Sequence, residues 1–302
     1  MIPARLRRNA VDVWGTAGAA WLDRLPELLD TIAADWNLDI AEPFVLSYHW
    51  VAATTRADGT AAVLKLGVPH QDHLAVEAAA LREYDGAGAV RLLAFDEARG
   101  ALLLERADPG TPASALVPQR DAEATAAAIS VLRRLHLPPS AEPALPDVAG
   151  QVDDFAAYLR EHPNGGPLPR KLVQHAAALF DELTASATAR VRLHGDLHHD
   201  NLLSASREPW LAIDPHGAVG DPGYDVGAWV YNPDPDRRDD ALLALVPDRI
   251  EQLADGLAMP TDRVVAYAFV KAVLSEVWTA EDGGTPGSRA LDVARLLQPR
   301  VS

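Results

Sequence analysis

The sequence predicts an α+β fold in two lobes: a small antiparallel β-sheet lobe that carries one helix, and a larger helical lobe. Strand-like apolar runs concentrate in the first third of the chain, and helical periodicity dominates the remainder. The stretch "ADPGTPASALVPQ" between these parts is rich in Pro, Gly and Ser and is typical of a linker. We predict a first lobe over residues 1–106, with a helical extension over 1–39 and a sheet over 40–106, and a helical lobe over 107–302.

Each element of the first lobe follows from a local pattern. Apolar residues at helical spacing predict a helix over residues 17–36, and "QDHLAVEAAALREYD" predicts a second helix over 71–85. Two β-rich runs flank "RADGT", whose Asp58-Gly59 pair is a strong hairpin signal. "AVRLLAFD" and "ALLLER" predict two further strands, joined by a turn at "EARG".

The second lobe alternates helices with short strands and loops. Helical segments are predicted over residues 121–136, 151–161, 168–185, 236–257, 262–281 and 287–298. "ARVRLHGDLHHDNLLSAS" and "EPWLAIDPHGAVGDPGYD" interrupt them with short strands and loops. Within the first interruption, "HGDLHHDN" crowds histidines, aspartates and an asparagine together, which is rarely structural.

The composition limits the classes of partner. Of the 302 residues, 48% are apolar and 23% are charged, as in ordinary globular proteins. The net charge of −16 argues against a nucleic-acid partner, because phosphates would repel it, and is compatible with a cationic small molecule. The absence of cysteine excludes disulfides, thiolate zinc sites and cysteine nucleophiles.

The hydropathy pattern gives no sign of a membrane protein. No run approaches the ~20 apolar residues of a membrane span, and Asp12 interrupts the apolar stretch near the N-terminus. We therefore expect a cytoplasmic protein without a membrane partner. A monomer and a homodimer are both compatible with the sequence.

A lysine and a glutamate in the first lobe are spaced as a pair. The chain has only three lysines, and Lys65 lies in the strand-like run "AAVLKLG", where its ammonium must face an anion or reach solvent. Glu77 follows twelve residues later in the predicted helix. We expect Glu77 to hold the ammonium of Lys65 in place.

The crowded motif suits phosphoryl transfer. Asp196 and Asn201 lie five residues apart in a loop, and Asp214 ends the strand "WLAI" eighteen residues after Asp196. In phosphoryl transfer one carboxylate orients the attacking hydroxyl, while an amide and a second carboxylate hold Mg²⁺ against the phosphates. The order and types of these three residues match that requirement.

A metal-dependent hydrolase is an alternative interpretation of the same motif. Such an enzyme would use His194, His198, His199 and Asp196 as ligands. It offers no explanation for the spacing of Asp214. An asparagine also suits zinc poorly, whereas hard oxygen ligands suit Mg²⁺.

The ordered set resembles the aminoglycoside phosphotransferases, which have a protein-kinase-like fold. Their catalytic loop reads H-G-D-x-x-x-x-N, which "HGDLHHDN" satisfies, and "DPHG" at residues 214–217 is similar to their metal motif. "EPWLAIDPHGAVGDPGYD" and "GALLLERADPGTP" look like stretches of the streptomycin 6-kinase group, the aminoglycoside/hydroxyurea antibiotic resistance kinases. The resemblance covers residues 44–282. It implies an ATP-dependent kinase for a hydroxyl of an aminoglycoside or amino sugar, with a hydroxyurea kinase or a metabolic sugar kinase as alternatives.

The resemblance also implies a role for each polar residue around the catalytic loop. Asp196 is expected to be the catalytic base or hydroxyl-orienting group, and Asn201 and Asp214 are expected to bind Mg²⁺. His194 is expected to pack beneath the loop and to bond its backbone. Asp225, in "GDPGYD", is expected to bond backbone groups of the loop.

The nucleotide site carries one departure from the family pattern. Lys65 and Glu77 are expected at the phosphates, and the segment from Glu105 to Ala107 is expected to form the hinge that binds adenine. The hairpin before Lys65 reads "SYHWVAATT" and lacks the usual glycines, so Ser47 and backbone amides are expected to bind the phosphates instead. The missing glycines leave ATP and GTP open as nucleotides. They also motivate a further alternative, a catalytically silent nucleotide-binding module.

The acceptor is expected to be cationic. "EVWTAEDGG" places Trp278, Glu281 and Asp282 near the end of a predicted helix, where negative charge is unfavourable against the helix dipole. A polyamine would stabilise these carboxylates, and Trp278 offers a cation–π face. His199 and His216 are further candidates for contact with the acceptor.

Overall fold

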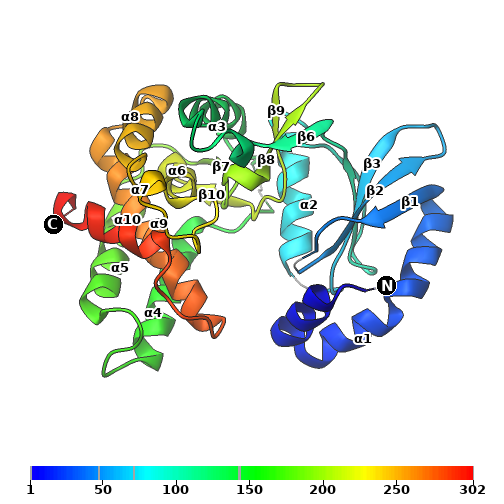
Figure 1. Cartoon of the computed structure of the whole chain (residues 1–302), viewed down its shortest axis with the longest axis horizontal. Coiled ribbons are helices and arrows are strands. Elements are labelled where there is room, and N and C mark those ends of the chain that lie inside the picture. Colours follow the sequence, from blue (N-terminus) through cyan, green and yellow to red (C-terminus); the bar gives the residue numbers. More distant parts are fainter. Residues whose placement is uncertain (1, 47, 71, 142–143, 302) are drawn as a thin grey trace. The chain divides into compact units, whose positions relative to one another are not determined.

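The computed structural model of the chain describes every residue except 1, 47, 71, 142–143 and 302. The chain divides into two compact units, residues 1–108 and residues 109–302 (Figure 1). The boundary predicted after residue 106 lies beside this division.

The first unit contains an antiparallel sheet of five strands. The strands are β1 (Leu38–Pro43), β2 (Trp50–Arg56), β3 (Ala61–Leu66), β4 (Leu92–Asp96) and β5 (Ala101–Glu105). They lie in the order β1-β2-β3-β5-β4, and all neighbours are antiparallel. The hairpin between β2 and β3 turns at Gly59, which has φ +82°, a conformation that favours glycine. The predicted antiparallel sheet and its hairpin are therefore confirmed.

The helices α1 (Ala4–Trp36) and α2 (Asp72–Tyr84) cover opposite faces of this sheet (Figure 1). Leu64 and Leu66 of β3 pack in one hydrophobic core with Leu25 of α1. Because successive side chains of a strand point to opposite faces, Lys65 points to the other face, where it meets Glu77 of α2.

Two features of the first unit differ from the prediction. Helix α1 begins at Ala4 and continues through a kink at Gly15, whose φ is +54°, whereas the apolar spacing predicts a helix only from residue 17. Strand β1 was not predicted, because its sequence "LDIAEP" has no clear apolar alternation. Its main-chain pairing with β2 holds it at the sheet edge instead.

The second unit is mainly helical and is organised around α9 (Thr261–Glu281). This helix is buried along most of its length and packs against α4, α5, α6, α8 and α10. The other α-helices are α3 (Asp121–Leu135), α4 (Val152–Glu161), α5 (Arg170–Ala185), α6 (Val226–Tyr231), α7 (Asp240–Leu243), α8 (Val246–Leu257) and α10 (Arg289–Leu297). Among the described residues, no helix combines the length and the apolarity that crossing a membrane would need.

The helix boundaries of the second unit follow the predicted spacing with two exceptions, one of which is the short helix α6, which was not predicted. Helices α3, α4, α5, α9 and α10 coincide with predicted segments to within a few residues. The segment 236–257 is instead broken into α7 and α8. Asp239 caps α7 by accepting a hydrogen bond from the backbone N–H of Ala241, and Pro247 lies in the first turn of α8, where a proline favours a helix start.

The prediction of a linker is wrong, because this segment contains regular structure. Residues Pro109–Pro112 form strand β6, and Ala113–Leu116 form the 3₁₀ helix η1. Strand β6 is the edge of a three-stranded sheet with β8 (Leu202–Ala205) and β9 (Trp210–Ala212). Edge strands tolerate proline, so a long-range pairing that local composition does not reveal orders this segment.

Candidate active site

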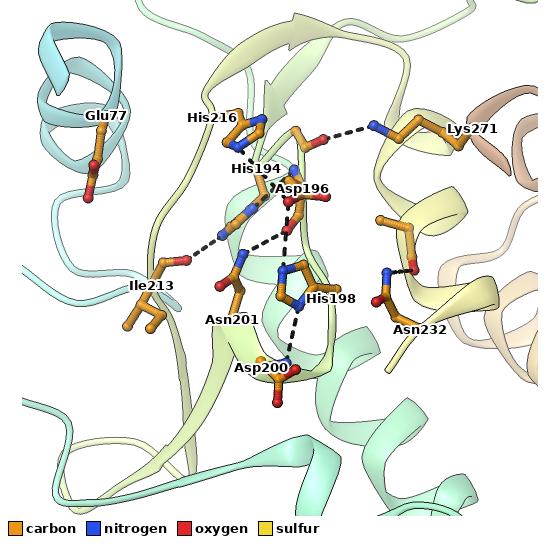
Figure 2. Close-up of polar contacts among 12 residues, drawn as sticks. Glu77, His194, Asp196, His198, Asp200, Asn201, Ile213, His216, Asn232 and Lys271 are labelled. Atoms are coloured by element: carbon orange, nitrogen blue, oxygen red, sulfur yellow. Dashed lines mark hydrogen bonds and ion pairs between the residues drawn. The ribbon is translucent and has the colours of Figure 1, made fainter. Parts of the chain in front are cut away.

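The motif "HGDLHHDN" forms a tight loop after strand β7 (Val191–Leu193), which pairs with β10 (Ala218–Gly220). Gly195 has φ +88°, and a Cβ atom there would lie 3.0 Å from Cβ of His216. Glycine is the residue that adopts this conformation and close approach without strain. The loop closes in the 3₁₀ helix η3 (His199–Asn201), and the side chains of Asp196, His198 and Asn201 gather on it (Figure 2).

Asp225 holds the beginning of this loop from beneath. Its carboxylate is buried and accepts hydrogen bonds from the backbone N–H groups of His194, at 2.9 Å, and Gly195, at 2.7 Å. Nε2 of His136 lies 2.9 Å from the same carboxylate. Burial alone would raise the pKa of Asp225. The hydrogen bond from His136, the charges of His136 and His194, and the hydrogen bond from the N–H of Gly195 nevertheless hold the pKa below its ordinary value. The side chain is therefore ionised, and its hydrogen bonds hold the start of the loop in place.

His194 also holds the loop in place, and its hydrogen-bond partners determine its tautomer. Its Nε2 lies 3.0 Å from the carbonyl oxygen of Ile213 and must donate to it (Figure 2). Its Nδ1 accepts from the backbone N–H of Asp196 at 3.3 Å. Burial lowers the pKa of this imidazole. The neutral ring thus connects the loop to Ile213, the residue before Asp214.

Asp196 carries a partly exposed carboxylate, whereas the carboxylate of Asp200 in the same loop accepts a hydrogen bond from the hydroxyl of Ser114. The Asp196 side chain is 24% exposed, and its Oδ2 lies 3.7 Å from Nε2 of His198 and 3.9 Å from Nε2 of His216. The His216 side chain is 54% exposed. The structure therefore brings the predicted catalytic residue together with one predicted acceptor contact, His216, and also with His198.

Asn201 and Asp214 lie at the same end of the β8–β9 hairpin. The backbone N–H of Ile213, next to Asp214, donates to the carbonyl oxygen of Asn201 at 3.0 Å. Nδ2 of Asn201 donates to the carbonyl oxygen of Asp196 at 3.1 Å, so the amide oxygen of Asn201 is the atom that faces away from this bond. Asp214 has φ +58°, a backbone conformation that residues other than glycine rarely adopt. An amide oxygen and a carboxylate are hard donors that fit Mg²⁺.

Lys65 and Glu77 form a buried ion pair within the first unit. Nζ of Lys65 lies 2.6 Å from Oε2 of Glu77, and their side chains are only 6% and 2% exposed. The structure thus brings together the pair that the strand-then-helix order predicts. Such a pair directs the lysine ammonium to a fixed position.

Glu105 and Ala107, the residues predicted to bind adenine, lie at the end of β5. The N–H of Glu105 donates to the carbonyl oxygen of Arg91 at 2.8 Å, and its carboxylate accepts from the N–H of Arg91 at 2.9 Å. Ala107 is buried two residues later. Two hydrogen bonds therefore fix Glu105 against Arg91 at the end of β5. Ser47, the expected phosphate contact, lies outside the described residues.

The carboxylates at the end of α9 belong to a larger acidic group. Nε1 of Trp278 donates to Oδ2 of Asp154 on α4 at 2.8 Å. Burial, followed by the charges of Asp154, Glu161 and Asp282, raises the pKa of Glu281. Asp154 was missed from the sequence, because no local pattern connects α4 to the end of α9. Its position adds a carboxylate to the surface predicted to bind a cation.

His199 does not fit its predicted contact with an acceptor. Its ring is fully buried and stacks on Trp229, with the ring centroids 3.7 Å apart. Burial, with further contributions from Arg249, His198 and Arg289, lowers the pKa of His199 well below its ordinary value. It is a core side chain, and we correct its assignment accordingly.

The same geometry weighs against the metal-dependent hydrolase. His194 uses both ring nitrogens in hydrogen bonds within the protein, and His199 points into the core. Across the part of the chain that the structure describes, no group of three or more histidine and carboxylate side chains is arranged to hold a metal ion. The ligand set that this alternative requires is not assembled.

Comparison with known proteins gives consistent matches along the chain. A family model described as aminoglycoside/hydroxyurea antibiotic resistance kinase matches residues 44–283. A streptomycin 6-kinase from Streptomyces glaucescens is 34% identical, over 98% of this chain and 94% of that protein. A hydroxyurea phosphotransferase from Kitasatospora aureofaciens is 33% identical, over 99% of this chain and 86% of that protein.

A solved structure supports the fold. An aminoglycoside phosphotransferase from Streptomyces rimosus, in complex with ADP and streptomycin, superposes with a TM-score of 0.55 at 20% identity. The match covers 82% of this chain and 97% of that chain. The predicted α+β, protein-kinase-like fold is thereby confirmed.

Proposed function

Since the chain belongs to the aminoglycoside/hydroxyurea antibiotic resistance kinase family, we propose that it transfers the γ-phosphoryl group of ATP to a hydroxyl of a cationic, streptomycin-like aminoglycoside. It is a phosphotransferase that binds a nucleotide and acts on a small molecule. The proposal adds the acceptor class, Mg²⁺ and the roles of individual residues.

One observation carries the proposal: Asp196 presents a partly exposed carboxylate on a backbone held by buried side chains, whereas the loop's other carboxylate, that of Asp200, accepts a hydrogen bond from the hydroxyl of Ser114. Asp196 is 24% exposed, while the amides before it are bonded to buried Asp225. A carboxylate fixed in this way can accept a hydrogen bond from an acceptor hydroxyl and orient its oxygen for in-line attack. Phosphoryl transfer needs little more covalent chemistry from the protein than this positioning.

The nucleotide would be bound by the other motif residues. Lys65, fixed by Glu77, would neutralise charge on the phosphates, and the backbone from Glu105 to Ala107 would bind the adenine. Asn201 and Asp214 would hold Mg²⁺, which when bound neutralises the charge that develops on the phosphate oxygens. Both are hard oxygen donors at one end of a hairpin, and this supports their assignment.

The acidic group around Trp278 supports a cationic acceptor. Burial, followed by the charges of Asp154, Glu161 and Asp282, raises the pKa of Glu281, and a polyamine would favour its ionised form. Trp278 contacts this group directly, because its Nε1 donates a hydrogen bond to Asp154. A second candidate, hydroxyurea, is favoured by the 33% identity to a hydroxyurea phosphotransferase but offers no cation for these carboxylates.

An acceptor panel tests the proposal. ADP release would be measured with ATP and Mg²⁺ against streptomycin, a neutral sugar and hydroxyurea, with GTP replacing ATP in a parallel series. We expect streptomycin to give the highest kcat/KM, and added salt to raise its KM because it screens charge pairs. Faster turnover of hydroxyurea or the neutral sugar would refute the cationic acceptor, and no turnover with any acceptor would support the silent nucleotide-binding module.

A further inference from the structure

A lysine that the roles assigned above leave unused lies directly behind the catalytic loop. Lys271 of α9 is completely buried, in a helix whose neighbouring residues are almost all apolar. Its ammonium reaches out of α9 to the loop that carries Asp196 (Figure 2). Close packing fixes its stem, because a Cβ atom on Gly227 of α6 would lie 2.4 Å from Cβ of Lys271.

The ammonium of Lys271 has two oxygen acceptors and two aromatic neighbours. It donates to the carbonyl oxygen of Gly195 at 3.2 Å and to the phenol oxygen of Tyr224 at 2.8 Å. The hydroxyl of Tyr224 in turn donates to Oε1 of Gln151. Nζ also lies 4.1 Å from the ring centroid of Tyr224 and 4.8 Å from that of Trp278. A single ammonium therefore touches both the catalytic loop and the aromatic residue of the proposed acceptor surface.

Packing alone gives no reason for a charge at this position. A methionine has a similar volume and would fill the space without the desolvation penalty of an ammonium. Burial lowers the pKa of Lys271 to about 8, opposed by the charges of Asp196, Asp225 and Asp154. These carboxylates and the phenol of Tyr224 are the titratable groups that face the ammonium, from the catalytic loop, from η4 (Pro222–Asp225) and from α4.

We propose that Lys271 is a positioning residue for phosphoryl transfer, whose ammonium holds the Gly195 carbonyl and thereby sets the Asp196 carboxylate against the acceptor bound beside Trp278. The proposal rests on the function proposed above for Asp196. It assigns Lys271 no contact with substrate, and its effect passes through the backbone of the loop.

The geometry of Gly195 explains how this effect arises. The N–H of Gly195 donates to Asp225, and its carbonyl oxygen accepts from Lys271, so both of its peptide groups are held by buried charged side chains of opposite sign. The carbonyl belongs to the peptide unit that joins Gly195 to Asp196. Gly195 has φ +88°, in a region where a glycine backbone is intrinsically mobile. Without the ammonium, only the 3.3 Å hydrogen bond from the N–H of Asp196 to Nδ1 of His194 restrains this peptide unit, which can then rotate and carry the Asp196 carboxylate away from the acceptor.

The test compares Lys271→Met with Lys171→Met, which removes an exposed lysine from α5 and serves as the matched control. kcat and KM for ATP and streptomycin would be measured by ADP release from pH 6 to 9.5, at saturating acceptor for kcat. We expect Lys271→Met to lower kcat roughly 10- to 100-fold, because displacement of a reacting group by about 1 Å costs on that order. The KM for ATP and the fraction of folded protein should be unchanged, and Lys171→Met should match the parent.

The pH profile separates positioning from a structural role. The kcat of the parent should fall as the pH rises through about 8, where the ammonium loses its proton, and Lys271→Met should lack that decline. Tyr224→Phe is a second test variant, in which Lys271 keeps its hydrogen bond to the Gly195 carbonyl. It removes one acceptor of the charged ammonium, so the decline should move to lower pH.

Two results would overturn the inference. One is a Lys271→Met protein with the kcat of the parent, or with the same decline above pH 8. The other, decisive also if Lys271→Met does not fold, is a Tyr224→Phe protein whose decline stays at the pH of the parent. Asp196→Ala distinguishes this failure from failure of the proposed function. If Asp196→Ala is inactive while these results hold, only the inference falls, whereas an active Asp196→Ala protein removes the proposed function itself.

Discussion

Replacing Asp225 by asparagine should both destabilise the protein and slow phosphoryl transfer. The carboxylate accepts from the amides of His194 and Gly195 and lies 2.9 Å from Nε2 of His136. An asparagine of the same shape offers one oxygen, so its amide nitrogen must face at least one of these donors. Hydrogen bonds to a charged group contribute about 1.5–3 kcal/mol each, and we expect Asp225→Asn to lower the free energy of unfolding by about 3 kcal/mol.

Urea unfolding and steady-state kinetics test this expectation, with Asp181→Asn, an exposed residue of α5, as the matched control. The pKa of Asp225 lies below its ordinary value of 3.8 in the folded protein. Its contribution to stability is therefore fully present at neutral pH and is lost as the pH falls below about 3.8. The difference in stability between parent and Asp225→Asn should be constant from pH 7 to 5 and shrink at lower pH. A variant with the stability and kcat of the parent at pH 7 would refute the reasoning.

Three further predictions concern the nucleotide, the metal and the acceptor. Lys65→Met should weaken ATP binding roughly 10- to 100-fold by calorimetry, and should lower stability because Glu77 loses its buried partner; unchanged affinity would remove Lys65 from the phosphate site. Asp214→Ala should raise the Mg²⁺ concentration needed for half-maximal rate, and an unaltered Mg²⁺ dependence would exclude it as a ligand. Glu281→Gln combined with Asp282→Asn should raise the acceptor KM strongly with little change in the KM for ATP, whereas an unchanged acceptor KM would relocate the acceptor surface.

The parts of the site that residues close in sequence form could be predicted. Alternation along β3 leaves Lys65 on one face of the sheet, and the next helix along the chain supplies Glu77, which the structure places 2.6 Å away. The fold class was predictable for the same reason, since each strand and helix carries its own periodicity. The resemblance of "HGDLHHDN" to a family motif supplied the expected roles of its residues.

What local pattern could not reveal are contacts between distant segments. Lys271 reaches Gly195 across 76 residues of sequence, and Trp278 reaches Asp154 across 124. Lys271 did leave one signal, a lone lysine in an otherwise apolar stretch of helix, which marks a buried cation in need of a partner. His199 shows the converse, because the motif places it beside catalytic residues while the fold stacks it on Trp229 in the core.

The central claim is that Asp196 orients the acceptor hydroxyl for attack on ATP. The most direct measurement is single-turnover phosphorylation of streptomycin by Asp196→Asn and by the parent, followed by mass spectrometry, with ATP affinity measured on both proteins. Loss of a positioned base typically costs 10²- to 10⁴-fold in rate. We predict phosphorylated streptomycin from the parent, a rate lower by about that factor from Asp196→Asn, and similar ATP affinity for the two proteins. Phosphorylation by Asp196→Asn at the rate of the parent would contradict the claim.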